Sequence, residues 1–145
     1  MYFVDREKIE EKLIYIEAQI RIFEEMKAYE STIEKLAAER IIHMVIEAVL
    51  DVGNSMIDGF IMRDPGSYED ILEILEDEKV ISEEMCASFK RIIPLRKVLL
   101  QFYTDMNHQE ILQTFKKELS ALKQFAPSVR DYIENELGPV TTFIP

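Results

Sequence analysis

The segment 94–107, "PLRKVLLQFYTDMN", places an arginine and a tyrosine, Arg96 and Tyr103, seven residues apart in a mainly apolar run. On a helix this spacing is nearly two turns, so the two side chains would share one face. They can be the outer part of a catalytic motif. They can also be the polar edge of a packed helix, with the arginine paired to an acid and the tyrosine hydroxyl hydrogen-bonded. Periodicity alone favours packing.

A second set of polar side chains recurs at spacings of three and four in the apolar stretch 40–62. Its members are Arg40, His43, Glu47, Asp51, Asn54 and Asp58. This stripe can be the solvated face of a bundle helix, or a partly buried row that faces another helix or a second subunit. Buried carboxylates need cationic partners. Arg40 cannot satisfy both Glu47 and Asp51, so we predict that Arg96 supplies a second cation.

The sequence lacks the short motifs of many catalytic and metal sites. It has no glycine-rich phosphate loop, no Cys-x-x-Cys, no His-Glu-x-x-His and no Gly-x-Ser-x-Gly. His43 and His108 are its only histidines, and the Glu-x-x-His pairs of di-iron bundles are missing. We therefore expect no metal and no cofactor. Cys86 is the only cysteine, and its apolar surroundings predict a small core residue rather than a nucleophile.

Helical periodicity dominates the elements that must position these residues. The apolar positions of a first helix form a narrow seam: Ile9, Leu13, Ile16, Ile20 and Phe23. A second helix is predicted over 33–62, and its mostly apolar circumference is typical of a central bundle helix. Gly53 lies inside that helix, where glycine costs about 1 kcal/mol relative to alanine. A close helix crossing would explain it.

Capping residues and prolines divide the chain into helices. The predicted N-caps are Asp5, Ser31 or Thr32, Ser67, Ser82 and Asn107. Pro94 predicts a kink or boundary before a helix over 95–104. Pro127 is expected to open a last short helix that stops at Gly138-Pro139. These features predict an all-α, single-domain antiparallel bundle over residues 1–145, with four to five main helices.

The composition limits the classes of partner. The formal charge of -11 opposes loose binding to nucleic acid, which draws most of its strength from Lys and Arg, although it does not exclude one basic pocket or a dimer cleft. No apolar run reaches the roughly 20 residues of a membrane-spanning helix. The N-terminus does not resemble a signal peptide. We expect a cytoplasmic protein with no membrane partner.

The order of these features resembles the HepT-like family of HEPN-domain proteins, from about residue 39 to about residue 125. The family's Arg…Glu-x-x-x-Asp helix is matched by Arg40, Glu47 and Asp51. Its Ser/Tyr-Asp helix start is matched by "SYEDILEIL", 67–75. Its Arg-Asn-x-Leu-x-His-x-Tyr signature aligns with "RKVLLQFY", 96–103. The signature is the specific part, and here it is only partly kept.

The resemblance implies a HEPN-like homodimer that cleaves RNA without a metal, through the signature arginine and histidine at a cleft between subunits. Histidine suits the role of proton acceptor, and arginine steadies the developing phosphorane charge. The resemblance also implies a toxin of the HEPN/MNT toxin–antitoxin type. Its partner would be an MNT-type nucleotidyltransferase that silences it by transferring AMP to the signature tyrosine, here Tyr103.

Two signature positions depart from the family. Lys97 replaces the asparagine, and Gln101 replaces the histidine. Lys97 could lend positive charge to a phosphate site, but glutamine does not titrate near neutral pH and cannot be the general base. His108 is expected beyond the helix end and is not expected to replace it.

Two hypotheses therefore stay open. One is a metal-independent endoribonuclease toxin, active or weakened. The other is a non-catalytic homodimeric scaffold or binding partner of a nucleotidyltransferase, for which RNA is not a substrate. A helical bundle unrelated to the family is a third interpretation.

Overall fold

Helices and short turns account for the described part of the chain, which is residues 2–138 of a computed structural model. The helices are α1 (Arg6–Glu25), α2 (Thr32–Gly59), α3 (Tyr68–Asp77), α4 (Glu83–Ile92), α5 (Pro94–Gln101), α6 (His108–Lys117) and α7 (Leu119–Leu137). No strand occurs between residues 2 and 138.

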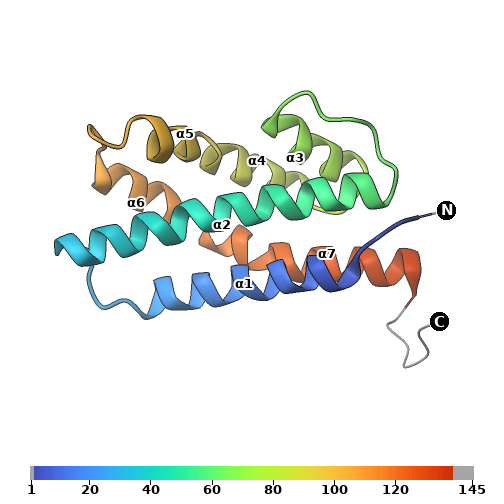
Figure 1. Ribbon diagram of the computed structural model, residues 1–145, viewed down its shortest axis with the longest axis horizontal. Coiled ribbons are helices and arrows are strands. Elements are labelled where there is room, and N and C mark those ends of the chain that lie inside the picture. Colours follow the sequence, from blue (N-terminus) through green and yellow to red (C-terminus); the bar gives the residue numbers. More distant parts are fainter. Residues whose placement is uncertain (1, 139–145) are drawn as a thin grey trace.

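Four long rods form the bundle, and α3 packs against one end of it (Figure 1). α4 and α5 join at Ile93, and α6 and α7 join at Glu118, so each pair forms one long rod with a single interruption. α2 contacts α1 on one side and α5 on another, while α7 contacts α1 and α4. Neighbouring rods run in opposite directions (Figure 1). The prediction of an all-α antiparallel bundle with four to five main helices is confirmed.

The helix starts follow the predicted capping residues. The side chains that accept a hydrogen bond from a first-turn backbone N–H are Asp5, Ser31, Ser67, Ser82 and Asn107. Ser31 forms a full capping box, because the Glu34 side chain accepts from the Ser31 backbone N–H in return. The choice between Ser31 and Thr32 is thus settled in favour of Ser31.

Two predicted boundaries were wrong. The long helix ends at Gly59 rather than near residue 62, because the chain turns at Ile61 with φ 55°. Pro127 lies inside α7 instead of opening a new helix. Proline removes the hydrogen bond to the carbonyl four residues earlier, and here both Pro127 and Lys123 are exposed, so solvent can reach that carbonyl. Gly138 follows α7 with φ 80° as predicted, whereas Pro139 lies outside the described residues.

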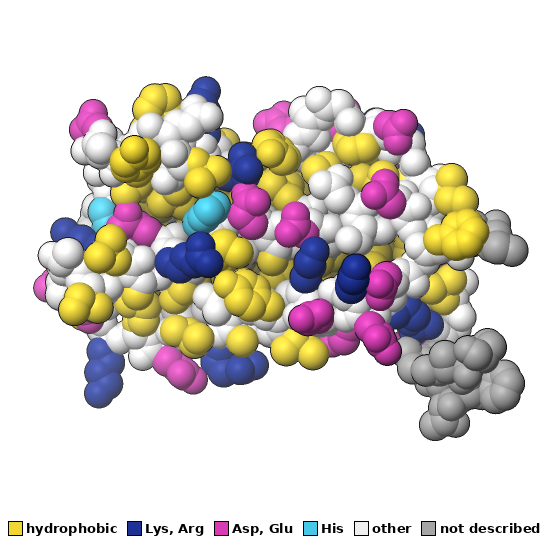
Figure 2. All heavy atoms as spheres, viewed as in Figure 1, with side chains coloured by type: hydrophobic (Ala, Val, Ile, Leu, Met, Phe, Trp, Pro, Cys, Tyr) yellow, Lys and Arg dark blue, Asp and Glu magenta, His cyan; other side chains and the backbone are white. Residues whose placement is uncertain are grey.

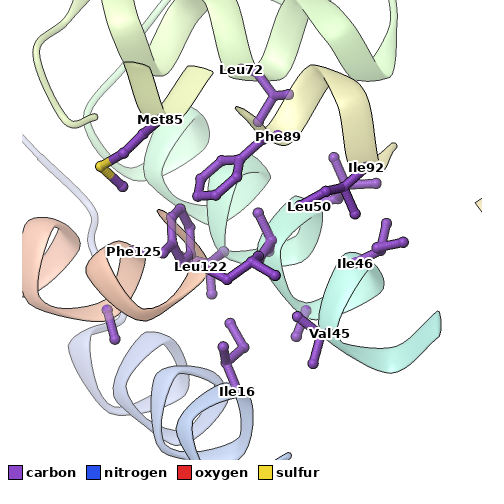
Figure 3. Close-up of a cluster of buried hydrophobic side chains, with 14 of the residues drawn as sticks. Ile16, Val45, Ile46, Leu50, Leu72, Met85, Phe89, Ile92, Leu122 and Phe125 are labelled. Atoms are coloured by element: carbon purple, nitrogen blue, oxygen red, sulfur yellow. The ribbon is translucent and has the colours of Figure 1, made fainter. Parts of the chain in front are cut away.

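The core is a continuous apolar cluster to which all seven helices contribute. Figure 3 shows its centre, where Phe89 of α4 faces Phe125 of α7. Their ring centroids are 5.6 Å apart and the rings meet edge to face. Ile16, Val45 and Leu50 close the cluster from α1 and α2 (Figure 3). Within residues 2–138, no helix combines the length and apolarity that crossing a membrane requires.

Gly53 marks the close helix crossing predicted from the sequence. A Cβ atom at this position would lie 2.6 Å from Cγ2 of Ile71, so α3 packs directly on the α2 backbone there. This contact sets where α3 lies against α2. It therefore fixes where the first residue of α3, Tyr68, stands relative to α2 and α5.

Candidate active site around Arg96

Arg96 is placed by the break between α4 and α5. Pro94 occupies the first turn of α5, where its missing N–H costs nothing. The chain therefore restarts as a helix at that point, and Leu95 is buried in the core. Arg96 follows on the side that faces α2, and its side chain is 26% exposed. The expected kink or boundary at Pro94 is confirmed.

Glu47 of α2 is the ionic partner of Arg96. Nε of Arg96 donates to Oε1 of Glu47 across the contact between α5 and α2. Nε2 of His43, one turn earlier on α2, lies 3.8 Å from the same oxygen. The Glu47 side chain is 27% exposed, so the pair is only partly desolvated. The prediction that Arg96 supplies a cation to the partly buried stripe is confirmed for Glu47.

Asp51 does not share this arginine. It lies one turn further along α2 and pairs with Lys12 of α1 at 3.7 Å, with both side chains largely exposed. Arg40 is exposed and forms no ion pair with any residue in 2–138. The stripe is thus split. His43 and Glu47 face α5 and are partly buried, while Arg40, Asp51, Asn54 and Asp58 form a solvated face.

The second half of the signature segment is not helical to its end. α5 stops at Gln101, and Phe102 adopts φ -111° and ψ 32°. Tyr103 then lies in a turn in which the N–H of Asp105 donates to the Phe102 carbonyl. The predictions of a helix to residue 104 and of a shared helix face for Arg96 and Tyr103 were wrong. So was the alternative that Tyr103 is packed, because 64% of it is exposed.

Gln101 and Lys97 are exposed on α5. Nζ of Lys97 lies 5.9 Å from the centre of the Phe102 ring, at the outer reach of a cation–π contact. Gln101 lies five positions after Arg96 on the helix, about 7.5 Å along the axis at about 1.5 Å per residue. The signature segment therefore displays an amide and a cation to solvent, and Tyr103 follows in the turn.

His108 begins α6, as the cap at Asn107 predicts, and its ring lies beside Glu39 of α2. Its Nδ1 lies 4.0 Å from Oε2 of Glu39, and neither ring nitrogen has a hydrogen-bond partner within residues 2–138. Glu39 is eight residues before Glu47, about 12 Å along α2. This separation supports the expectation that His108 does not act beside Arg96 in the same chain.

Tyr68 is the site residue that the sequence did not single out. The guanidinium carbon of Arg96 lies 4.6 Å from the centre of its ring. An aromatic residue directly after the N-cap Ser67 was the available signal, but "SYED" indicated only a helix start. The α2–α3 crossing that brings Tyr68 to Arg96 is a tertiary contact, and local periodicity does not report it.

In the view of Figure 2, cationic, anionic and apolar side chains are interspersed over α1 and α2, and both histidines lie in the left half. No cluster of three His, Cys, Asp or Glu that could hold a metal ion occurs among the described residues. Cys86 lies in the core, where burial raises the pKa of its thiol to about 12, as expected for an inert residue.

Comparison with known proteins identifies relatives along nearly the whole chain. The family model described as "Ribonuclease HepT-like" matches residues 7–129. A Bacillus subtilis (strain 168) protein named "Putative RNase YutE" is 48% identical over 143 residues, 99% of each chain. The solved structure of YutE, described as a cytosolic protein of unknown function, has a TM-score of 0.94 at 48% identity and covers 99% of this chain and 100% of its own.

More distant solved structures share the fold. A tri-AMPylated Shewanella oneidensis HEPN toxin in complex with an MNT antitoxin has a TM-score of 0.74 at 16% identity, over 85% of this chain and 96% of that chain. A toxin–antitoxin structure with AMP-PNP has a TM-score of 0.73 at 17% identity, over 83% and 96%. The family match and the close relative together show that this chain belongs to the ribonuclease HepT-like family.

Proposed function

We propose that this chain is the RNA-cleaving toxin component of a HEPN/MNT toxin–antitoxin pair, and that its cleavage activity is weakened or lost. The observation that carries the proposal is Gln101. It occupies the histidine position of the signature, exposed at the end of α5, about 7.5 Å along the helix from Arg96. Family membership supports the RNA-directed part of the proposal.

The reaction needs no metal in this proposal. The ribose 2′-oxygen attacks the adjacent phosphorus and loses its proton to a base, the bond from phosphorus to the 5′-oxygen breaks, and that oxygen is protonated as it leaves. The products are a 2′,3′-cyclic phosphate and a 5′-hydroxyl. Arg96 would neutralise the charge that develops on the phosphorus oxygens.

Gln101 cannot accept the proton, because a side-chain amide does not titrate near neutral pH. General acid–base catalysis typically contributes about 10²- to 10⁴-fold to a rate. A site that keeps the arginine and lacks the base should therefore retain binding and lose most of the chemical rate. Lys97 would add charge for the RNA backbone, and Arg40 and Asp51 would stand at the rim as supporting residues.

The second candidate function is a non-catalytic homodimer that binds a nucleotidyltransferase. The exposure of Tyr103 favours it, because a partner enzyme could reach this hydroxyl. In that reaction the tyrosine oxygen would attack the α-phosphorus of ATP and release pyrophosphate, leaving AMP on Tyr103. A related HEPN toxin is AMPylated and bound to an MNT antitoxin, which supports a similar partner here.

Dimerisation belongs to both candidates. The bundle leaves apolar side chains exposed on α1 and α2: Ile14, Tyr15, Ile22, Ile33 and Leu36. A second copy covering such side chains would also convert the open face around Arg96 into a cleft. Cytoplasmic residence is part of the same proposal, since RNA and a nucleotidyltransferase would both be met there.

Cleavage of a fluorescent single-stranded RNA by the purified chain tests the proposal. We expect little cleavage by the native chain, a clear gain in Gln101→His, and loss of that gain when Arg96→Ala is added. Arg63→Ala is the control, since Arg63 also pairs with one acid, Asp77, and lies outside the signature segment. Strong cleavage by the native chain that survives Arg96→Ala would exclude the proposed site.

A further inference from the structure

The guanidinium of Arg96 is contacted by two groups from different helices. Glu47 of α2 accepts from Nε, and the ring of Tyr68, the first residue of α3, lies 4.6 Å from the guanidinium carbon. We propose that Tyr68 is a positioning residue for Arg96. Its ring holds the guanidinium so that Nη1 and Nη2 face a bound phosphate. This inference rests on the proposed function, because it concerns the same arginine.

The two contacts leave one part of the guanidinium open. Glu47 accepts from Nε, and the guanidinium carbon lies over the Tyr68 ring. Within residues 2–138, Nη1 and Nη2 of Arg96 donate no hydrogen bond. These two nitrogens form the planar fork that binds phosphate oxygens in pairs. Arg96 is therefore held through Nε and the ring contact, which leaves Nη1 and Nη2 for the phosphate.

Tyr68 is held in place although its side chain is partly exposed. Ser67 caps α3, and the Asp70 carboxylate accepts from the Gly66 N–H at 2.7 Å, so the turn before Tyr68 is fixed. Further along α3, Ile71 packs on the bare backbone of Gly53. Tyr68 thus projects from a well-anchored first turn.

The physical gain is preorganisation. A free arginine side chain populates many rotamers, and ordering it before the ligand arrives lowers the entropic cost of binding. The attraction between a guanidinium and an aromatic ring uses the ring quadrupole and not the hydroxyl. Tyr68→Phe should therefore preserve the effect, whereas Tyr68→Leu should remove it while keeping an apolar side chain at that position.

The geometry is tested by NMR of the full chain, with the Arg96 side-chain signals assigned through Arg96→Lys. Ring-current shifts of the Arg96 side-chain protons should be present in the native chain and in Tyr68→Phe, and absent in Tyr68→Leu. Tyr2→Leu is the matched control, because Tyr2 is 46% exposed against 45% for Tyr68 and its ring contacts Phe60 rather than Arg96. Arg96 signals that are unchanged in Tyr68→Leu would overturn the proposal.

The functional consequence is tested by the affinity for a short single-stranded RNA at fixed salt. We expect Tyr68→Leu to bind about 5- to 30-fold more weakly, and Tyr68→Phe and Tyr2→Leu to stay within about twofold of the native chain. An unchanged Tyr68→Leu, or a Tyr68→Phe as weak as Tyr68→Leu, would contradict positioning by the ring. If Arg96→Ala binds RNA as well as the native chain, the proposed function fails, while the NMR result still decides whether Tyr68 positions the arginine.

Discussion

Glu47 and Asp51 lie one turn apart on α2 and have the same chemistry, yet their environments differ. The Glu47 side chain is 27% exposed and hydrogen-bonded to Arg96. The Asp51 side chain is 53% exposed and lies 3.7 Å from the flexible side chain of Lys12. Exposed ion pairs contribute about 0–1 kcal/mol, while hydrogen bonds to charged groups in less solvated sites contribute more. The position on the stripe, not the residue type, decides which carboxylate contributes more to stability.

Removing the charge of Glu47 should therefore lower the free energy of unfolding more than removing the charge of Asp51. We expect Glu47→Gln to lower the free energy of unfolding by about 1–2 kcal/mol, because Arg96 loses a charged acceptor. Asp51→Asn is the control and should change it by less than about 0.5 kcal/mol. Urea unfolding measures both, and equal effects in the two variants would contradict the split of the stripe.

Cys86 provides a prediction for alkaline pH. Its thiol has an ordinary pKa of 9.0, and burial raises this to about 12 in the folded chain. Between these values the unfolded thiol has lost its proton and the folded one keeps it. The contribution of Cys86 to the free energy of unfolding is therefore present below pH 9 and is lost as pH rises toward 12.

The matching measurement is thiol labelling. Cys86 should react with a disulfide reagent at pH 8 only as fast as the chain opens, and Cys86→Ala should fall less in stability than the native chain between pH 9 and pH 11. Rapid labelling of the folded chain at pH 8 would show that the thiol is accessible.

At the scale of elements, the sequence predicted what local chemistry decides. The N-caps and the break at Pro94 follow from side chains that satisfy, or cannot supply, backbone hydrogen bonds, and the structure confirms them. The Pro127 prediction failed because an exposed proline is tolerated within a helix that packs on its other face. Tyr68 was missed because only the tertiary contact of α3 with α2 brings it to Arg96.

Gly53 tests that tertiary contact. Alanine should favour an isolated helix by about 1 kcal/mol, but its Cβ would lie 2.6 Å from Cγ2 of Ile71. We expect Gly53→Ala to lower the free energy of unfolding by about 1–3 kcal/mol, because overpacking outweighs propensity. The neighbouring exposed Asn54→Ala should be neutral or slightly stabilising. A Gly53→Ala variant that is more stable than the native chain would mean that α3 can move off α2 freely.

At the scale of the molecule, an ion-pair network joins the first and last helices of the bundle. Arg130 of α7 donates to Glu10 and Glu17 of α1 through four hydrogen bonds of 2.7–2.9 Å. The Arg130 hydrogen bond lowers the pKa of Glu17. Together with the continuous core, this link supports our proposal that residues 1–145 act as one domain.

One domain that pairs with itself should give a single unfolding transition whose midpoint rises with protein concentration. Far-UV circular dichroism and tyrosine fluorescence should report the same midpoint. Light scattering at micromolar concentration should give twice the 17.0 kDa chain mass. Separate transitions would contradict the single domain, and a concentration-independent midpoint with a 17.0 kDa particle would contradict the dimer.

With Gln101 at the histidine position, the proposed site lacks a general base but keeps its arginine. The most direct measurement is the single-turnover rate of RNA cleavage by the native chain and by Gln101→His, followed from pH 5 to pH 8. We predict that the histidine variant is faster by about 10²-fold or more, with a rate that rises through the titration of the imidazole near pH 6.5. A native chain that cleaves as fast as Gln101→His, with the same pH profile, would contradict the claim.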